Sequence, residues 1–355
     1  MKLEDAIDFN PTEKLAKNTY AKKIGMDKLS PFYKYICSFE YEKYSGGAKF
    51  RNGDTIVARI TPCLENGKTA YIDLLDDGEI AFGSTEFIVM RNKENVTIPE
   101  YVYYLSISPR FREKAISLMT GTSGRQRVQL DPLKKEKFHI PSIHNQIKMV
   151  KILGTIDEKI KLNSKINNNL YKLIKNNYES LINGCNWEEV ELGAISNITS
   201  GKRPVDKSET GEYPVIGANG IMAYTSNFNF NEDLIITGRV GTLGVVRRYL
   251  DKIWASDNTL VIQTKYLNYI GNYLKNIDYY SLNRGSTQPL LTQGDLKKQI
   301  IYFNEEMVGK FEKENQIFVE KIRNNEKENQ RLEQLRDTLL PKLMNDEIDL
   351  DNIEI

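Results

Sequence analysis

The sequence predicts an α+β protein in which two similar, mostly β globular domains are joined by two long helices that pair as an antiparallel coiled coil. Three observations predict this fold. A long internal repeat closes each time on a related motif, GTSGRQRVQLDPLKK at 121–135 and GSTQPLLTQGDLKK at 285–298. Each copy contains short runs rich in β-branched and aromatic residues, which are typical of strands. Each copy is followed by a long segment with a 3.5-residue apolar period, which is typical of a coiled-coil helix.

The strands follow the same order in both copies. In the first copy an acid and an apolar run ending in Arg59 precede a Gly turn, a second run and a third run headed by Ser84. The second copy repeats this order, with Arg239 and Ser256 at the equivalent places. The runs are, in order, GDTIVARI, GKTAYID and AFGSTEFIVMR, then EDLIITGRV, GTLGVVRR and WASDNTLVIQT. Because the repeat is much longer than a solenoid repeat, each copy should be one domain.

The predicted boundaries are 1–141 for the first domain, 142–184 for the first helix, 185–303 for the second domain and 304–355 for the second helix and tail. Asn183-Gly184 is predicted to end the first helix and Pro341 the second. If each helix carries the chain back toward the other domain, the domains lie at opposite ends of the pair and are related by a pseudo-twofold axis.

Several Asn residues interrupt the apolar seam of each predicted helix. They are either polar positions tolerated near helix ends, or buried layers that fix helix register and pairing at a cost in stability. The candidates for a register role are Asn163, Asn167, Asn177, Asn315, Asn325 and Asn329.

Composition narrows the function classes. The net charge of +1 argues against a histone-like protein held on DNA by global charge, but permits a locally basic surface. The sequence lacks both an apolar run long enough to span a membrane and the apolar core of a signal peptide. Three scattered cysteines (Cys37, Cys63, Cys185) fit a reducing cytoplasm, and neither they nor the two histidines have metal-site spacing. No methyltransferase or nuclease motif marks a catalytic residue.

Two similar domains at a fixed separation suit a ligand with two similar sites, such as duplex DNA. Base recognition in the major groove uses Arg or Lys on guanine and Asn or Gln on adenine. The alternative is that such arginines lie in solvent or pair with acids. Arg59 and Arg239 recur in both copies, so phosphate or structural roles suit them better than recognition of two different half-sites. The candidate DNA contacts are Arg59, Lys68, Ser123, Arg125, Gln126, Arg127 and Gln129 in the first domain and Lys202, Arg203, Asn219, Arg239, Arg284, Ser286, Thr287 and Gln288 in the second.

The chain also resembles a known family. It is similar to the specificity subunits of type I restriction–modification systems. The first target-recognition domain of that family resembles residues 82–91 and 121–141, and the second resembles residues 214–225, 237–244, 255–262 and 285–298. The conserved C-terminal region of the family resembles LRDTLLPKLMNDEIDL at 335–350. The resemblance implies a non-catalytic subunit that binds a bipartite, asymmetric DNA target, while its helices set the spacer and dock two methyltransferase subunits. Two restriction–translocation subunits would complete the enzyme. It implies no cofactor on this chain, with S-adenosylmethionine, ATP and Mg²⁺ on the partner subunits.

Two other functions are considered. The chain could be a self-contained DNA methyltransferase or nuclease with degenerate motifs, which activity of the isolated chain would reveal. It could instead be a coiled-coil scaffold protein, although a scaffold does not require paired polar loops.

Overall fold

The computed structural model describes residues 1–122, 124–184, 186–208 and 211–350. The chain divides into two compact units, one formed by Met1–Asn163 with Glu328–Ile355 and the other by Ser164–Lys327. These are called unit 1 and unit 2 below. Ser123 and Cys185 lie outside the described residues.

Each unit contains a four-stranded antiparallel sheet with the same strand order. In unit 1 this sheet runs β1 (Ile7–Phe9), β8 (Phe87–Asn92), β5 (Thr55–Ala58) and β6 (Thr69–Tyr71). In unit 2 it runs β12 (Asn197–Ser200), β18 (Thr259–Gln263), β15 (Leu234–Gly238) and β16 (Arg247–Tyr249). The internal repeat of the sequence is therefore a repeat of topology.

Each unit also contains a second sheet in which one strand pair is parallel. In unit 1 the order is β3 (Glu40–Lys43), β2 (Tyr20–Ile24), β7 (Ala81–Gly83) and β4 (Lys49–Phe50), with β2 parallel to β7. In unit 2 the order is β14 (Gly220–Thr225), β13 (Tyr213–Gly217) and β17 (Trp254–Ala255), with β13 parallel to β17. The third apolar run predicted in each copy is thus two strands, β7 and β8 or β17 and β18, that belong to different sheets.

The central strands are buried on both faces, which explains their unbroken apolar sequences. In β5, Ile56 packs into the cluster between the two sheets and Val57 into the cluster shared with the helices. In unit 2, Ile236 of β15 packs into the cluster between the two sheets and Ile235 into the cluster shared with the helices. In each unit the antiparallel four-stranded sheet therefore lies between the second sheet and the helical layer.

Short elements complete the two units. In unit 1 they are α1 (Leu3–Ala6), the 3₁₀ turn η1 (Met26–Lys28), α2 (Pro99–Ile107), α3 (Pro109–Ser117), β9 (Met119–Thr120), β10 (Arg127–Val128) and α4 (Leu130–Lys135). In unit 2 they are β11 (Glu188–Glu191), α6 (Leu192–Ile195), α7 (Leu267–Leu274), α8 (Gln293–Lys297) and β19 (Ile300–Phe303). The β11–β19 pair of unit 2 is reduced in unit 1 to a single bridge between Lys2 and Lys137.

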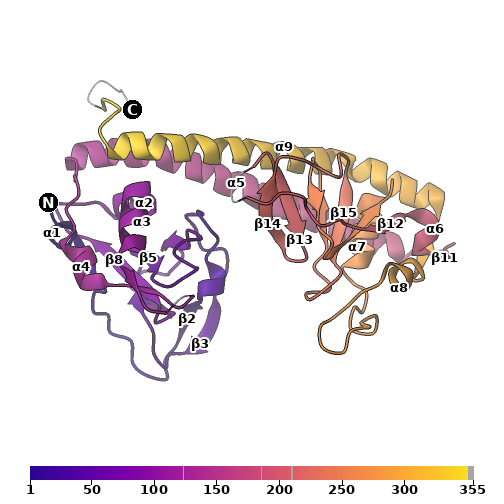
Figure 1. The fold of residues 1–355 in the computed structure, drawn as a ribbon, viewed down its shortest axis with the longest axis horizontal. Helices are drawn as coiled ribbons and strands as arrows, with labels where there is room; N and C mark the ends of the chain where they lie inside the picture. Colours follow the sequence, from indigo (N-terminus) through magenta and orange to yellow (C-terminus); the bar gives the residue numbers. More distant parts are fainter. Residues whose placement is uncertain (123, 185, 209–210, 351–355) are drawn as a thin grey trace. The chain divides into compact units, whose positions relative to one another are not determined.

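The two long helices, α5 (Ile143–Ile182) and α9 (Glu305–Met344), each contain 40 residues (Figure 1). Their starts agree with the predicted ones to one residue. The prediction that Pro341 ends the second helix is wrong, because α9 continues through it to Met344. A proline removes one backbone hydrogen-bond donor. Because Pro341 lies in the last turn of α9, the backbone hydrogen bonds of the neighbouring residues are enough to continue the helix to Met344.

Within each unit the two helices run antiparallel. In unit 1, Asp157 is hydrogen-bonded to Arg336 and Asn163 to Asn329, so residue numbers rise along α5 as they fall along α9. In unit 2 the same holds for the Asn167–Asn325 and Asn177–Asn315 pairs. The predicted antiparallel pairing is confirmed within each unit.

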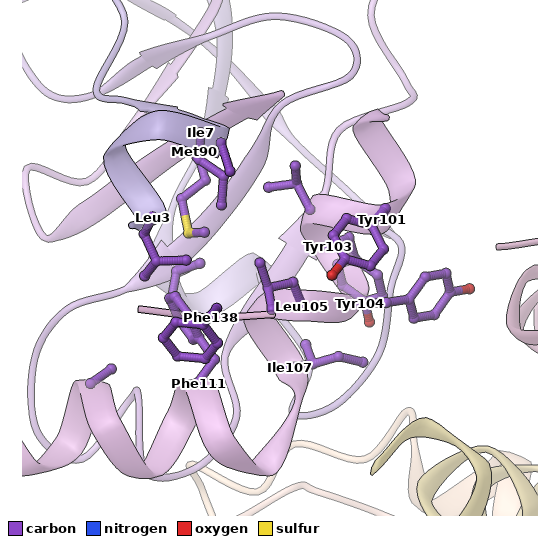
Figure 2. Packing of buried hydrophobic residues seen from close by; sticks show 14 of the residues in the cluster. Leu3, Ile7, Met90, Tyr101, Tyr103, Tyr104, Leu105, Ile107, Phe111 and Phe138 are labelled. Carbon is purple, nitrogen blue, oxygen red and sulfur yellow. The ribbon is translucent and has the colours of Figure 1, made fainter. Parts of the chain in front are cut away.

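The helices belong to the hydrophobic cores of the domains that they carry. In unit 1, Leu3, Ile7 and Met90 pack with the aromatic residues of α2 and with Phe111 and Phe138 (Figure 2). Met149 and Leu153 of α5 and Leu340 and Leu343 of α9 are buried in the same cluster. In unit 2, Tyr178 of α5 and Phe311 of α9 pack around Tyr269 of α7.

Candidate nucleic-acid interface

The two arginines that recur in the repeat have the same backbone contacts in both units. The amide N–H of Arg59 donates to the carbonyl of Glu86 at 2.9 Å, and its carbonyl accepts from the N–H of Val128 at 2.9 Å. Arg239 makes the equivalent bonds, to Asn258 and from Leu291, both at 2.8 Å. Each arginine thus joins the turn before a central strand to the polar loop predicted to contact DNA.

The side chains of these two arginines also bond to backbone carbonyls. Arg59 donates from Nη2 to Val128 at 3.1 Å, and Arg239 donates from Nη1 to Asp257 at 3.3 Å. Both side chains are half-buried. This geometry is that of a structural residue, although a phosphate contact through the remaining N–H groups stays a prediction.

In unit 1 the polar loop is the turn between β9 and β10. β9 and β10 pair antiparallel, with Arg127 opposite Thr120, and the carbonyl of Gln126 accepts from the N–H of Thr61 at 3.1 Å. Arg125 is exposed, and no described group accepts a hydrogen bond from its side chain. Ser123, also predicted to contact DNA, lies outside the described residues. The loop is therefore fixed at its base, and Arg125 projects from it into solvent.

Arg127, in the same loop, pairs with an acid from another element. Its Nε donates to the two carboxylate oxygens of Glu86 at 2.9 and 3.0 Å, and its Nη2 donates to Oε1 at 2.7 Å. The Arg127 side chain is nevertheless 53% exposed. The hydrogen bonds and charge of Glu86 raise the pKa of Arg127, so the guanidinium stays charged.

Unit 2 has a comparable arrangement in the loop at 284–290. The side-chain oxygen of Asn283 accepts hydrogen bonds from the N–H groups of Gly285 and Leu290, both at 2.9 Å, and thereby closes the loop. Arg284 donates from Nε and Nη2 to Asp295 at 3.1 and 2.7 Å, with 64% of its side chain exposed. Arg284, followed by the hydroxyl of Thr292, lowers the pKa of Asp295 to about 2.

The other candidate contacts lie around these loops or at other turns. Lys68 donates to the carbonyl of Met26 at 2.9 Å, and Gln129 donates to the hydroxyl of Thr120 at 2.6 Å. Asn219 lies in the two-residue turn between β13 and β14. Five further candidates are exposed and make no side-chain hydrogen bond to another described residue: Lys202, Arg203, Ser286, Thr287 and Gln288. DNA contact by all of these residues stays a prediction.

The asparagines of the helical seam meet in three pairs. Asn163 donates to Asn329 at 2.9 Å in unit 1, and in unit 2 Asn325 donates to Asn167 at 2.7 Å and Asn177 to Asn315 at 2.9 Å. Four of the six are buried: Asn163, Asn167, Asn315 and Asn325. The geometry is that of paired polar layers between antiparallel helices; their role in fixing register stays a prediction.

The acidic partners Glu86 and Asp295 were not predicted from the sequence. Nor was a buried ion pair in unit 1, in which Arg336 donates to Asp157 at 3.1 Å and Tyr104 donates to the same carboxylate at 2.6 Å. The one available signal was an arginine, Arg336, at an apolar position of the predicted helical seam.

Among the helices described, none is both long and apolar enough to cross a membrane. No group of three or more His, Cys, Asp or Glu side chains in the described ranges has a geometry that could hold a metal ion.

The duplicated topology, the paired long helices and the two polar loops define a protein with two recognition domains on a helical connector. Residues 1–172 and 185–336 match the model of the type I restriction modification DNA specificity domain, so this chain belongs to that family and contains two copies of its domain. This confirms the family resemblance seen in the sequence.

Known members of the family show how far the similarity extends. The chain is 27% identical over 169 residues to the HindI specificity subunit of Haemophilus influenzae, covering 43% of this chain and 36% of that protein. It is 26% identical over 310 residues to the MjaIX specificity subunit of Methanocaldococcus jannaschii, covering 72% of this chain and 70% of that one. A solved S subunit of a type I system from M. genitalium shares the fold, with a TM-score of 0.55, 18% identity and coverage of 97% of this chain and 95% of that chain.

Proposed function

We propose that this chain is the DNA specificity subunit of a type I restriction–modification enzyme and itself catalyses no reaction. It binds a bipartite, asymmetric double-stranded DNA target, and each unit recognises one half-site. The observation that carries the proposal is a duplicated scaffold with different loops: the antiparallel four-stranded sheet has the same strand order in both units, while one loop contains GTSGRQR and the other GSTQPL. Similar scaffolds with different polar loops suit two different half-sites.

The long helices would set the spacer between the half-sites. They would also dock two methyltransferase subunits. Each unit leaves large apolar side chains exposed on its helical segments, Leu162 (52%) and Leu335 (47%) in unit 1, and Leu173 (45%) and Ile317 (67%) in unit 2. Exposed apolar side chains on rigid helices suit a protein partner, and their presence in both units suits two copies of it.

The chemistry would belong to the partners. The methyltransferase subunits would modify adenine with S-adenosylmethionine, and two restriction–translocation subunits would use ATP and Mg²⁺. The enzyme would act in the cytoplasm, where cellular and incoming DNA are both accessible. The alternative of a self-contained methyltransferase or nuclease is not supported by any catalytic motif in the sequence, and the scaffold alternative leaves the two polar loops without a role.

The experiment is to express the full chain with its methyltransferase and to sequence the methylated adenines. We expect one bipartite motif with a fixed spacer. Replacement of residues 1–141 by the first domain of another family member should change one half-site and leave the other half-site and the spacer unchanged. A change in both half-sites would contradict the modular assignment, and methylation by the chain alone would contradict the non-catalytic role.

A further inference from the structure

Both units expose one loop arginine whose guanidinium is held along the same edge. In Arg127 and in Arg284, Nε and Nη2 donate to a carboxylate of the same unit. Those two groups form one side of the planar guanidinium. The other edge, formed by Nη1 and the second N–H of Nη2, has no described acceptor in either residue, and both side chains are more than half exposed.

The free edge has a defined chemical use. A guanidinium carries five N–H donors in a rigid fork, so a carboxylate on one edge leaves a second pair of donors pointing outward. That pair matches the O6 and N7 acceptors that guanine presents in the major groove. A phosphate oxygen could also accept from it, but a single phosphate contact does not require an oriented fork.

The acids are themselves held in place. The N–H of Glu86 donates to the hydroxyl of Ser84 at 3.1 Å, and its carbonyl accepts from the N–H of Arg59. Asp295 lies in α8, where its carboxylate accepts from the Thr292 hydroxyl at 2.7 Å and its N–H donates to that oxygen at 3.1 Å. Because the backbone of Glu86 and the carboxylate of Asp295 are held in this way, and each acid pairs with its arginine, each arginine loses less rotational freedom when it binds a ligand.

These arrangements do not derive from the repeat. Ile60 bridges to Arg127 in unit 1 and Val240 bridges to Leu290 in unit 2, so Leu290 occupies the place of Arg127. Similarly, the backbone partners of Arg59 and Arg239 put Asn258 at the place of Glu86. The two units thus reach the same arginine geometry from different positions, which is expected of residues adapted to two different half-sites rather than of shared scaffold.

We propose that Arg127 and Arg284 each recognise one guanine, one in each half-site, and that Glu86 and Asp295 are the positioning residues that aim them. This inference rests on the proposed function, because it names the base and the residues through which each unit recognises DNA. Loss of one such bidentate contact is expected to weaken binding about 5- to 150-fold.

The test uses the full chain in complex with its methyltransferase and a duplex carrying its methylation motif. Each guanine of the motif is replaced in turn by 7-deazaguanine, which lacks the N7 acceptor, or by inosine, which keeps N7 and O6 and lacks only the minor-groove amino group. We expect 7-deazaguanine at one position per half-site to weaken binding about tenfold, since half of a bidentate contact is lost, and inosine there to have little effect.

Variants then assign the two positions. In Arg127→Ala the penalty for 7-deazaguanine should disappear in one half-site and persist in the other, and Arg284→Ala should show the reverse. Glu86→Gln should reduce the same penalty without abolishing binding. Glu79→Gln is the matched control: it lies in the same unit, pairs with Lys22, and is 22% exposed compared with 21% for Glu86. It should leave both penalties unchanged.

The failures can be told apart. Persistence of both penalties in Arg127→Ala and Arg284→Ala would overturn the inference and leave the proposed function standing. So would a uniform loss of affinity with a shallower salt dependence, which indicates a phosphate contact. Absence of sequence-specific binding by the unmodified complex would overturn the inference and the proposed function together.

Discussion

The side-chain amide of Asn325 donates a 2.7 Å hydrogen bond to the side-chain oxygen of Asn167, and both residues are almost fully buried between α5 and α9 of unit 2. A buried amide needs a partner, because an unpaired one loses its bonds to water without replacement. Sliding one helix along the other would separate this pair and the Asn177–Asn315 pair at once. The paired asparagines thus give a physical reason for one register to be preferred.

We predict that Asn167→Leu destabilises the protein by about 1–3 kcal/mol, because the substitution leaves the buried amide of Asn325 without its acceptor. Urea denaturation followed by circular dichroism measures the change. The double variant with Asn325→Leu should recover most of the loss while weakening the preference for one register. A single variant as stable as the parent would show that the pair contributes nothing.

The buried ion pair of unit 1 leads to a second prediction. Asp157 and Arg336 are both 3% exposed in their side chains, so removal of one charge leaves the other buried. We expect Asp157→Asn to cost about 3 kcal/mol of stability, by the same measurement. The control is Asp337→Asn, which removes a 60% exposed partner of the same arginine and should cost less than about 1 kcal/mol. Equal effects of the two substitutions would contradict this account.

The Arg284–Asp295 pair predicts a pH dependence. The folded-state pKa of Asp295 is about 2, below the usual 3.8. Its stabilising contribution is therefore fully present above about pH 4 and is lost as the pH falls through about 2. Carboxyl NMR titration of the full chain should place the Asp295 midpoint near 2, and Arg284→Ala should move it toward 3.8. A midpoint near 3.8 in the parent protein would show that the pair does not persist in solution.

The proposed role of the helices as a spacer predicts the effect of matched insertions. Four residues inserted after Asn163 and four after Lys327 lie at the boundary between the units and leave the contacts within each unit intact. They lengthen each helix by about 6 Å and rotate it by about 40°. Two base pairs of DNA add a similar length and rotate by about 70° in the same direction.

The preferred spacer should therefore grow by about two base pairs, with both half-site sequences unchanged, as measured by sequencing of methylated adenines. Insertion into α5 alone serves as the control. It should destabilise the protein, because it shifts Asn167 and Asn163 relative to their partners in α9. An unchanged spacer after the matched insertion would contradict the proposed role of the helices.

Much of the fold could be predicted because its signals are periodic. The 3.5-residue seam indicated the two long helices, the start signals at Pro141-Ser142 and Asn304-Glu305 lie within two residues of their first residues, and the matched runs identified the duplicated domains. Apolar residues at this spacing, Met149 and Leu153 in α5 and Phe311 and Ile322 in α9, are buried. The predicted end at Pro341 failed because a proline signal does not reveal how many flanking bonds remain in the last turn.

The details of the interface were harder to predict, because they depend on contacts between residues far apart in the sequence. Glu86 lies 41 positions before Arg127, and a glutamate in a surface turn has no distinctive sequence pattern. The repeated motif was even misleading here. Its two aspartates, Asp131 and Asp295, look equivalent, yet Asp131 pairs with Lys134 while Asp295 holds Arg284.

The way in which segments of the chain are divided between the two units also has a consequence for its synthesis. Unit 2 is one continuous segment, Ser164–Lys327, whereas unit 1 combines Met1–Asn163 with the last part of α9. On the ribosome, unit 2 has all its residues before synthesis ends. The first domain, although made first, must wait for Leu340 and Leu343 to emerge before its core can close over Met149 and Leu153. The N-terminal half of the chain is therefore the last to mature, and premature termination would leave it with an open apolar surface.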